Sequence, residues 1–200
     1  MPREITYSIE KILDLAMNQF WYHGYSSTSM SDLVNVMKVS RAAIYSNFKN
    51  KDELFLACLD RYREQVVSPA FIVVEDCDAD LSSIRRYFNF QIGAAEEAGL
   101  PGPGCMYANS MTETAPHNSK VQTRVAAHNK RLIHGFRNAL ANTDKNSVLK
   151  PSELDNLAEL LATSAQGLWS YSRAVSNAEP LYNYVNSLLA LIQYRVSHRK

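Results

Sequence analysis

The chain has 200 residues, of which 46% are hydrophobic and 20% are charged, so it can bury a sizeable core and is not expected to be disordered. Its formal net charge of +1 excludes a strong overall basic field, and any contact with nucleic acid has to come from a local cluster of cations. Seven glycines and seven prolines are few for this length, and residues of high helix propensity recur in long stretches, which favours an all-α fold.

The three cysteines, Cys58, Cys77 and Cys105, are an odd number for a disulfide scaffold, and the chain opens without the pattern of a secretory leader. The longest apolar runs, such as residues 70–74, are much shorter than the roughly 20 residues that a membrane-spanning helix needs. We therefore expect a cytoplasmic protein with no membrane segment.

A first helix is predicted from apolar residues that recur three and four positions apart between Ile5 and Phe20. It is expected to end near Gly24, because glycine takes the positive φ of a helix C-cap without a steric penalty. Ser29 and Asp32 have the spacing of a capping box, in which each side chain bonds the backbone N–H of the other residue. This pair predicts a short second helix.

The third helix is expected to be very short. The apolar pattern breaks at residues 38–39, and Ser40 is a suitable N-cap for a helix over residues 41–45. Asn50 is a further suitable cap, followed by acidic residues in the first turn of an amphipathic fourth helix, which we expect Pro69 to end. Three helices, with a tight turn between the last two, therefore fit within the first fifty residues.

The remainder of the chain is also predicted to be helical. Residues 71–74 are apolar and mostly β-branched, but no partner strand lies nearby, so we expect irregular or helical structure there. Residues 99–104 are rich in glycine and proline, and the polar segment 142–151 is a second break. The periodicity predicts helices near residues 80–98, 105–115, 118–142, 151–177 and 180–198.

Positive charge gathers where the turn and the third helix are predicted. Lys38, Arg41, Lys49 and Lys51 lie within residues 38–51, a stretch that contains no acidic residue before Asp52. A helix that enters a DNA major groove needs small residues at its N-terminal end, long donors for base edges, and cations or hydroxyls for phosphates. The stretch supplies this set, although runs of charge are also common on solvated surfaces.

Two motifs stand out within roughly residues 9–59. The first is Thr-Ser-Met-Ser-Asp-Leu at residues 28–33, and the second is Val-Ser-Arg-Ala-Ala-Ile-Tyr-Ser-Asn-Phe-Lys-Asn-Lys-Asp-Glu-Leu-Phe at residues 39–55. In these motifs, and above all in the Ile-Tyr-x-x-Phe-x-x-Lys-x-Glu-Leu spacing, the chain resembles the TetR family of one-component bacterial regulators. The resemblance implies a DNA-binding domain, then a helical domain that dimerises and binds a small inducer that relieves repression.

The resemblance also implies two kinds of DNA contact. Base edges would be read by Arg41, Ala42 and Ala43, just after the helix start at Ser40. Phosphates would be contacted by Thr28, Ser29, Tyr45 and Lys51. The carry-over implies that double-stranded operator DNA is the partner.

The sequence departs from the family pattern at Lys38 and Ala42, where glycine is common. Lys38 is therefore expected to adopt a left-handed backbone conformation, which is uncommon for a residue with a side chain. Tyr45 and Phe48 have an alternative role as core aromatics, which we expect for Phe48 rather than for Tyr45.

Two further surfaces are predicted on the later helices. The last two helices carry more apolar residues than one subunit obviously needs, so we expect a homodimer with a four-helix interface that reads a palindromic operator. The alternative is packing within the monomer. The predicted interface residues are Leu161, Leu168, Val185, Leu188, Leu189 and Ile192.

A pocket for an unidentified small-molecule effector is expected where large apolar side chains carry a few polar tips. Aromatic residues at helical spacing are also typical of an ordinary core, so the two interpretations stay open. The predicted pocket residues are Phe88, Ile92, Tyr107, Met111, Phe136, Trp169 and Tyr171.

No catalytic or metal centre is indicated, and we expect no cofactor. The loop at residues 99–104 has prolines where a phosphate-binding loop needs backbone N–H groups. A thiol beside this loop, Cys105, suggests a redox sensor, but a buried thiol usually acts as a small hydrophobic group. The residues that lack the spacing of metal ligands are Glu113, His117, His128 and His134.

The sequence thus predicts an all-α protein with an N-terminal three-helix helix-turn-helix domain over residues 1–50. A helical effector-binding and dimerisation domain is expected over residues 51–200. The expected function is that of a repressor released from its operator by a small molecule. Two rivals are an all-α enzyme whose basic N-terminal segment binds an anionic substrate, and a non-catalytic helical adaptor.

Overall fold

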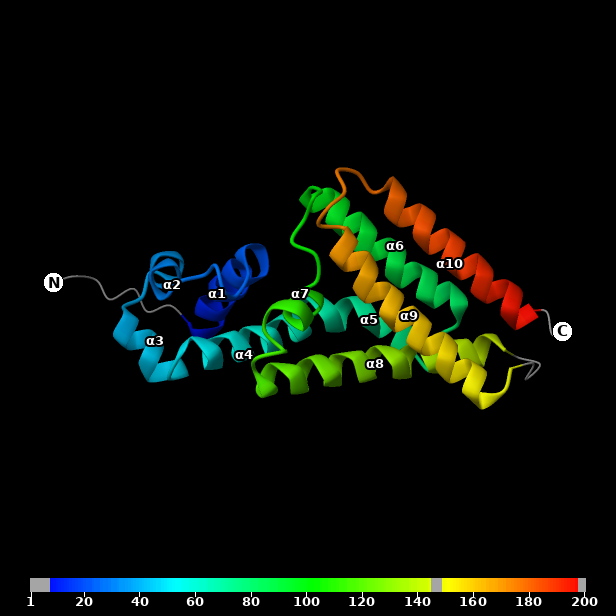
Figure 1. Ribbon diagram of the computed structural model, residues 1–200, viewed down its shortest axis with the longest axis horizontal. Coiled ribbons are helices and arrows are strands. Elements are labelled where there is room, and N and C mark those ends of the chain that lie inside the picture. Colours follow the sequence, from blue (N-terminus) through cyan, green and yellow to red (C-terminus); the bar gives the residue numbers. More distant parts are fainter. Residues whose placement is uncertain (1–7, 145–148, 198–200) are drawn as a thin grey trace.

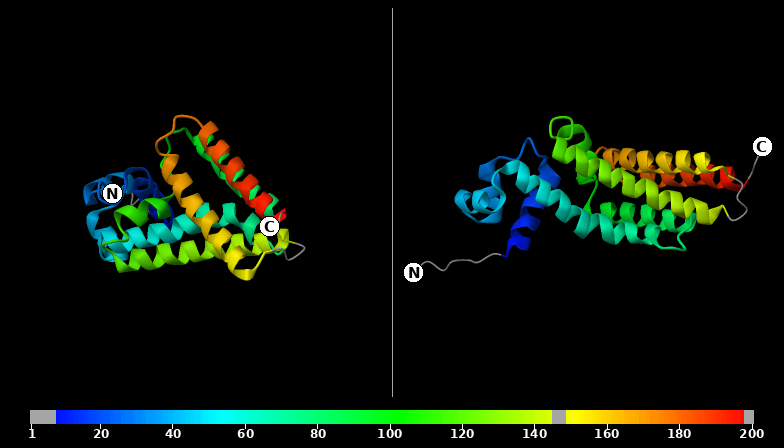
Figure 2. Two further views of the ribbon diagram at one scale, coloured as in Figure 1. Left: turned by 45° about the vertical axis from the view of Figure 1, so that its right-hand side comes forward. Right: turned by 90° about the horizontal axis from the view of Figure 1, so that it is seen from below.

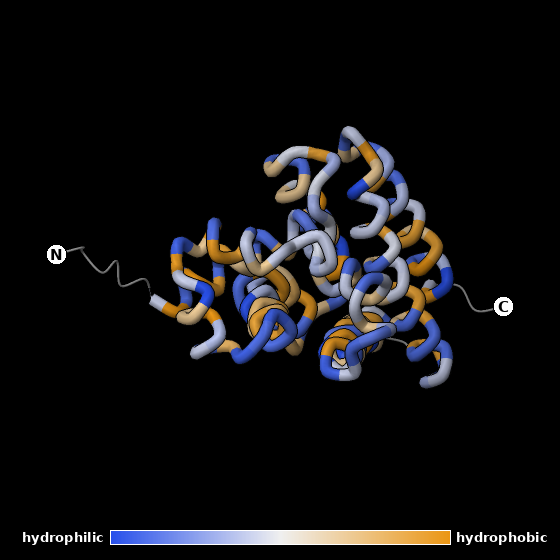
Figure 3. The backbone as a smooth tube through the Cα atoms, turned by 60° about the vertical axis from the view of Figure 1, so that its left-hand side comes forward, coloured by the Kyte–Doolittle hydropathy of each residue, from blue (hydrophilic) through white to orange (hydrophobic). Residues whose placement is uncertain are grey.

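The computed structural model describes residues 8–144 and 149–197, and within these two ranges every regular element is a helix (Figure 1). The predicted all-α fold is therefore confirmed. Hydrophobic and hydrophilic segments recur along the helical coils (Figure 3), as expected where helices have one buried and one solvated face.

The first unit consists of α1 (Ile9–His23), α2 (Met30–Met37), α3 (Arg41–Phe48) and α4 (Lys51–Tyr62). The predicted helix starts are confirmed at Ser29, Ser40 and Asn50, whose side chains each accept the N–H three residues further on. These caps determine where α2, α3 and α4 begin, because each satisfies a backbone donor that the first turn leaves unpaired.

The core of the first unit joins one buried face from each helix. Phe20 from α1 packs edge-to-face on Phe55 from α4, with ring centroids 5.1 Å apart. Leu33 from α2 and Ile44 from α3 are buried beside them. Ile44 is the one fully buried residue of α3, and Phe48 packs partly buried against the core, which leaves the outer face of the helix uncovered.

The chain continues from α4 without a break through a π-helical segment, η1 (Arg63–Val67), into α5 (Ser68–Glu75). The expectation that Pro69 ends the helix was wrong. Pro69 occupies the first turn of α5, where a missing N–H removes no required hydrogen bond. Residues 71–74 are helical, and Phe71 and Val74 face the core.

The second unit consists of α5 with α6 (Leu81–Ala98), α7 (Met106–Glu113), α8 (Ser119–Thr143), α9 (Pro151–Tyr171) and α10 (Glu179–Ser197). The helices α8 and α9 lie along one another, and α10 packs on α6 (Figures 1 and 2). Helix α9 ends at Tyr171, six residues before the predicted end, where the chain turns towards α10.

An aromatic cluster fills the centre of the second unit. The ring centroids of Phe71 and Phe136 are 5.3 Å apart in an edge-to-face arrangement, and Tyr87 stands at 5.2 Å from Phe71. Gly135 makes this packing possible, because a Cβ at that position would lie 2.7 Å from the Phe71 ring. The centre of α8 therefore requires glycine for steric reasons.

Helix α7 ties the two units together at both of its ends. Just before it begins, the backbone oxygen of Gly104 accepts a hydrogen bond of 2.8 Å from the indole of Trp21. At its end, the carboxylate of Glu113 accepts the backbone N–H groups of Tyr25 and Ser26, at 3.0 and 2.8 Å. The turn between α1 and α2 is therefore held directly by the second unit.

Over the two described ranges, no helix combines the length and the apolar character that crossing a bilayer requires.

His128, on α8, is buried with an exposed fraction of only 6%, and its ring stacks on that of Tyr107 with centroids 4.3 Å apart. Burial lowers the pKa of His128 to about 4, and the positive charge of Arg131 acts in the same direction. Among the described residues, its Nδ1 atom has no hydrogen-bond partner. The imidazole is therefore neutral in the folded protein at neutral pH.

This burial predicts a loss of stability in acid. Between pH 6.5 and pH 4 the unfolded chain protonates His128 while the folded chain does not, so the free energy of unfolding falls as the pH falls. In urea unfolding at pH 7 and pH 4.5, we expect the wild type to lose about 2–3 kcal/mol more than His128→Phe. His134→Asn, at an exposed histidine, serves as the control and should behave as the wild type. Equal losses in wild type and His128→Phe would contradict the prediction.

Candidate functional site

The outer face of α3 is the most open helical surface of the first unit, at one end of the molecule (Figure 1). Arg41 and Ala42 are exposed in its first turn, and Tyr45 follows with 42% of its surface accessible. Phe48 is partly buried against the core, in agreement with its expected role as a packing residue. Tyr45 instead projects from the surface.

The predicted DNA-contact residues are not all equally accessible. Ser29, Ser40, Arg41, Ala42 and Tyr45 are exposed, and Ala43 is partly exposed. Thr28 is completely buried, and its hydroxyl donates a 2.7 Å hydrogen bond to the backbone oxygen of Gly24. Its predicted phosphate contact is thus corrected: the hydroxyl of Thr28 closes the turn between α1 and α2.

Lys51 has a neighbour that the sequence did not indicate. Its Nζ atom lies 4.1 Å from the centroid of the Tyr25 ring, and the hydroxyl of Tyr25 donates to Asp52. Partial burial lowers the pKa of Lys51, while the carboxylates of Glu113 and Asp52 act in the opposite direction. Lys51 therefore packs against the turn that follows α1, in addition to any contact with a ligand.

Lys38 and Lys49 flank α3, and both have a positive φ, which is unusual for residues with a side chain. Lys38 has φ 57° and ψ 32°, which confirms the left-handed conformation expected there. Lys49 has φ 60° and ψ −48°, and the N–H of Asn50 donates to the oxygen of Phe48 across it at 2.6 Å, which is a γ-turn of the strained kind. No glycine pattern at residue 49 announces this turn in the sequence.

Three cations around α3 form no ion pair with a described carboxylate. Within residues 8–144 and 149–197, no carboxylate lies within 4.0 Å of the charged groups of Lys38, Arg41 or Lys49. The first turn of α3 also contains no acidic residue, so the positive end of its helix dipole is uncompensated. Both features favour an anionic partner at this face.

The six side chains predicted for the dimer interface lie instead inside the subunit. Leu161, Val185 and Leu189 are fully buried, and none of the other three is more than 7% exposed. The prediction took the apolar stripes of α9 and α10 as surplus, but α8 and α6 cover them. This part of the prediction is corrected.

A different apolar stripe is exposed on the same two helices. On α10, Tyr184, Leu191 and Tyr194 recur at helical spacing, and Leu191 has 70% of its surface accessible. On α9, Leu160 is exposed, and at Gly167 an added Cβ would meet nothing within 4 Å. The hydroxyl of Tyr184 donates to Ser164 Oγ at 2.9 Å, which holds the two exposed faces next to each other.

The seven residues predicted for the ligand pocket fall into three groups. Phe88, Ile92, Phe136 and Tyr107 are core residues with 1% exposure or less. Met111 is exposed and lines a separate hollow beside Gln166. Tyr171 is exposed too, and neither residue lines the apolar cavity between the two units. Of the seven residues, only Trp169 lines that cavity.

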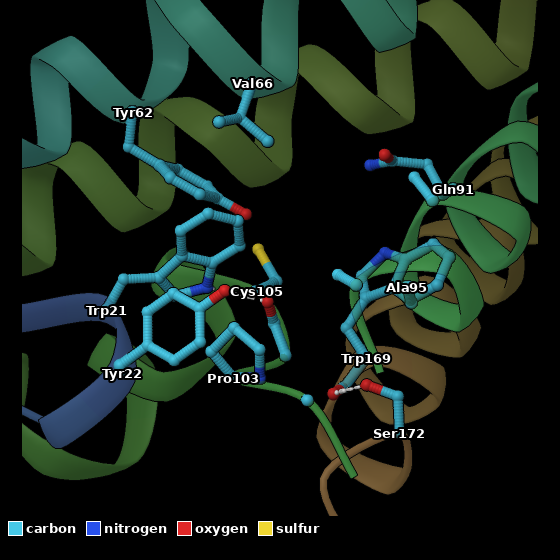
Figure 4. Close-up of a pocket in the computed structure, with 14 residues that line it drawn as sticks. Trp21, Tyr22, Tyr62, Val66, Gln91, Ala95, Pro103, Cys105, Trp169 and Ser172 are labelled. Atoms are coloured by element: carbon cyan, nitrogen blue, oxygen red, sulfur yellow. Dashed lines mark hydrogen bonds between the residues drawn. The ribbon is translucent and has the colours of Figure 1, made fainter. Parts of the chain in front are cut away.

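The cavity itself lies between the two units and has a volume of about 140 Å³. Figure 4 shows Trp21, Tyr22 and Tyr62 on one side of it and Gln91, Ala95 and Trp169 on the other. The loop before α7 closes it between these walls with Pro103 and Cys105. The sequence indicates a break between helices at this loop, but no pattern in it indicates that α1 contributes to a cavity there.

The thiol of Cys105 is not activated in this position. It is buried, and burial raises its pKa. Burial also raises the pKa of the neighbouring Tyr62 hydroxyl well above its usual range. Both groups are therefore uncharged at neutral pH.

Comparison with known proteins matches the first unit to one family model, described as bacterial regulatory proteins of the tetR family, over residues 12–58. The match begins inside α1 and ends inside α4, so it covers the whole of α2 and α3.

Longer similarities extend over both units. The chain is 27% identical over 182 residues to the HTH-type transcriptional repressor ComR of Escherichia coli (strain K12), covering 90% of this chain and 86% of that protein. It is 23% identical over 194 residues to the uncharacterized HTH-type transcriptional regulator YezE of Bacillus subtilis (strain 168), covering 96% and 100%. The fold is similar to that of the TetR family regulator CifR, solved with 26 bp double-strand operator DNA, with a TM-score of 0.80, 21% identity and coverage of 94% and 98%.

The strained turn at Lys49 leads to a stability prediction. A residue with a side chain costs roughly 1–3 kcal/mol in such a conformation, and glycine avoids that cost at an entropic loss of roughly 0.5–1 kcal/mol. Lys49→Gly should therefore raise the free energy of unfolding by about 1 kcal/mol, measured by urea denaturation. Lys130→Gly, at an exposed position within α8, is the matched control and should lower it by a similar amount. A destabilised Lys49→Gly protein would show that the turn is not strained.

Proposed function

We propose that this chain is a member of the tetR family of bacterial regulatory proteins and a cytoplasmic transcriptional repressor that binds a palindromic operator as a homodimer. A small-molecule effector releases it from the DNA. The observation that carries the proposal is α3, whose exposed Arg41 and Tyr45 lie between two cations, Lys38 and Lys49. Neither lysine forms an ion pair within the described chain.

Helix α3 suits the major groove of DNA in its details. Ala42 and Ala43 keep its N-terminal turn narrow, so the backbone can approach the base edges closely. Arg41 is the one long donor in this turn and can form the bidentate contact that arginine makes with guanine. Reading of a base therefore falls to Arg41.

The groups around α3 suit the two phosphate strands that flank a groove. Lys38 lies before the helix and Lys49 after it, so the two cations are separated by its whole length. The hydroxyl of Tyr45 projects from the exposed face, and Ser29 lies at the exposed start of α2. Contacts of this kind set the register of the protein on DNA and supply most of the salt-dependent affinity.

A homodimer follows from the exposed stripe of α9 and α10. Leu191, Tyr184 and Leu160 form an uncovered apolar surface on two adjacent helices, and Gly167 permits close approach of a second backbone. Two helices from each subunit would bury this surface in a four-helix interface. Two copies of α3 about 34–36 Å apart would then reach successive major grooves on one face of the duplex.

The relatives support this function. ComR is named as a transcriptional repressor, and CifR was solved bound to double-strand operator DNA. Repression of this kind requires binding and no chemical turnover, so we assign the chain no enzymatic activity. An effector can release such a protein only if it binds the DNA-free conformation more tightly than the DNA-bound one.

The first prediction concerns DNA recognition. In a titration of operator DNA from the chain's own upstream region, Arg41→Ala should lose roughly 1–3 kcal/mol of discrimination at one base pair of each half-site. Lys49→Ala should keep the same sequence preference and reduce the slope of log affinity against log salt by about one for each subunit. Lys130→Ala, a distant exposed cation on α8, is the control for a general charge effect. An Arg41→Ala protein with unaltered base preference would exclude base reading by this residue.

The second prediction concerns the dimer. Leu191→Glu places a carboxylate on each side of the proposed interface, where burial without a partner is costly. Sedimentation velocity should show a monomer, and operator affinity should fall about 100-fold or more, because two linked half-sites are no longer engaged together. Ile72→Glu makes the same change at a residue of α5 that is 66% exposed and should leave the dimer intact. A dimeric Leu191→Glu protein would place the interface elsewhere.

A further inference from the structure

The cavity between the two units has walls of contrasting origin. Trp21 and Tyr22 belong to α1 in the first unit, whereas Gln91 and Trp169 belong to α6 and α9 in the second. Figure 4 shows these side chains facing each other across an open space, closed on one side by the loop that carries Cys105. Any molecule held there contacts both units at once.

The lining contains no ionisable cation or carboxylate. Its side chains are aromatic, aliphatic or uncharged polar groups, and all of its lining residues are among those that the structure describes. A charged molecule would have to leave water without a counter-ion, which costs several kcal/mol. The raised pKa values of Cys105 and Tyr62 agree, since they too result from poor solvation of this region.

The volume sets the size of the occupant. At about 140 Å³ the cavity is close to that of an apolar cavity of about 150 Å³ that holds one benzene molecule. The indoles of Trp21 and Trp169 lie on opposite sides of this space (Figure 4) and can pack against an aromatic ring. The amide of Gln91 and the hydroxyl of Tyr62 are directed towards the space and can bond one small polar substituent (Figure 4).

From this geometry we infer that the cavity binds the effector, and that the effector is an uncharged molecule built on a single aromatic ring with one small polar substituent. The inference rests on the proposed function as a ligand-released repressor and names the class of ligand and its site. It also assigns a role to Trp21, which joins the ligand to the first unit.

The coupling follows from the same contacts. The indole N–H of Trp21 donates to Gly104 at 2.8 Å, so α1 and the loop before α7 are joined at the edge of the cavity. A ring inserted between Trp21 and Trp169 fixes the separation of α1 from α9. Because α1 carries α2 and α3, this separation sets the direction in which α3 points.

Four commercial molecules of similar size test the ligand class. Benzyl alcohol and toluene are uncharged, whereas benzoate is an anion and benzylamine a cation at pH 7. Both tryptophans of the chain line the cavity, so occupancy is expected to change the intrinsic fluorescence in a saturable way. We expect benzyl alcohol to bind most tightly, toluene to bind too, and the two charged probes to bind at least ten times more weakly.

Calorimetry on DNA-free variants locates the site. Ala95→Phe fills the cavity and should abolish the binding of benzyl alcohol, whereas Ala127→Phe makes the same change at an exposed position of α8 and should not. Circular dichroism and thermal melting of both variants check that each is folded. Binding that survives in a folded Ala95→Phe protein would overturn the assignment, as would charged probes that bind as tightly as benzyl alcohol, or no binding by either uncharged probe.

Operator binding then separates this inference from the proposed function. Saturating benzyl alcohol should weaken the wild-type complex with operator DNA at least tenfold. If the operator is bound but benzyl alcohol neither binds nor weakens the complex, the ligand assignment fails and the repressor function stands. If no operator DNA is bound even without ligand, the proposed function fails, while calorimetry still decides whether the cavity takes an uncharged ring.

Discussion

Glu113 helps to determine where α3, the helix proposed to bind DNA, lies relative to the rest of the chain. Its carboxylate accepts two backbone N–H groups, from Tyr25 and Ser26, in the turn between α1 and α2. Such charge-assisted bonds are short and directional, so the turn has little freedom. Gly24 leaves the space for this contact, since an added Cβ would lie 3.1 Å from the carboxylate oxygen. With the Trp21 contact at the other end of α7, the first unit is fixed at two separated points.

The local structure of the first unit could be predicted because it depends on hydrogen bonds between residues close in sequence. Ser29, Ser40 and Asn50 each cap the helix that follows by accepting the N–H three residues ahead, a spacing that the backbone itself fixes. The left-handed Lys38 was foreseen from a missing glycine, whereas the γ-turn at Lys49 was not, because no residue type marks it. The helix end expected at Pro69 was wrong for a related reason. The sequence shows that Pro69 lacks an N–H, but not that a new helical turn begins there.

Long-range features escaped prediction, since an apolar stripe shows that a helix face is covered without showing by what. Leu161 and Leu189 were expected to contact a partner subunit, but the subunit itself covers them. Leu191, two residues after Leu189 and on a different face of α10, is exposed. The cavity was harder still to predict from the sequence, because Trp21 and Trp169 are 148 positions apart (169 − 21). Only the folded chain brings them to facing walls.

The helix is continuous from Lys51 to Glu75, and we treat it as a rigid rod. Val66, near its middle, lines the cavity. From Val66 to Lys51 the rod extends by about 22 Å at roughly 1.5 Å per residue. A tilt of about 5° at Val66 consequently displaces its far end by about 2 Å, given that helical rise. That far end carries the Asn50 cap and α3, so in the proposed dimer a displacement too small to disturb the core changes the separation of the two α3 helices.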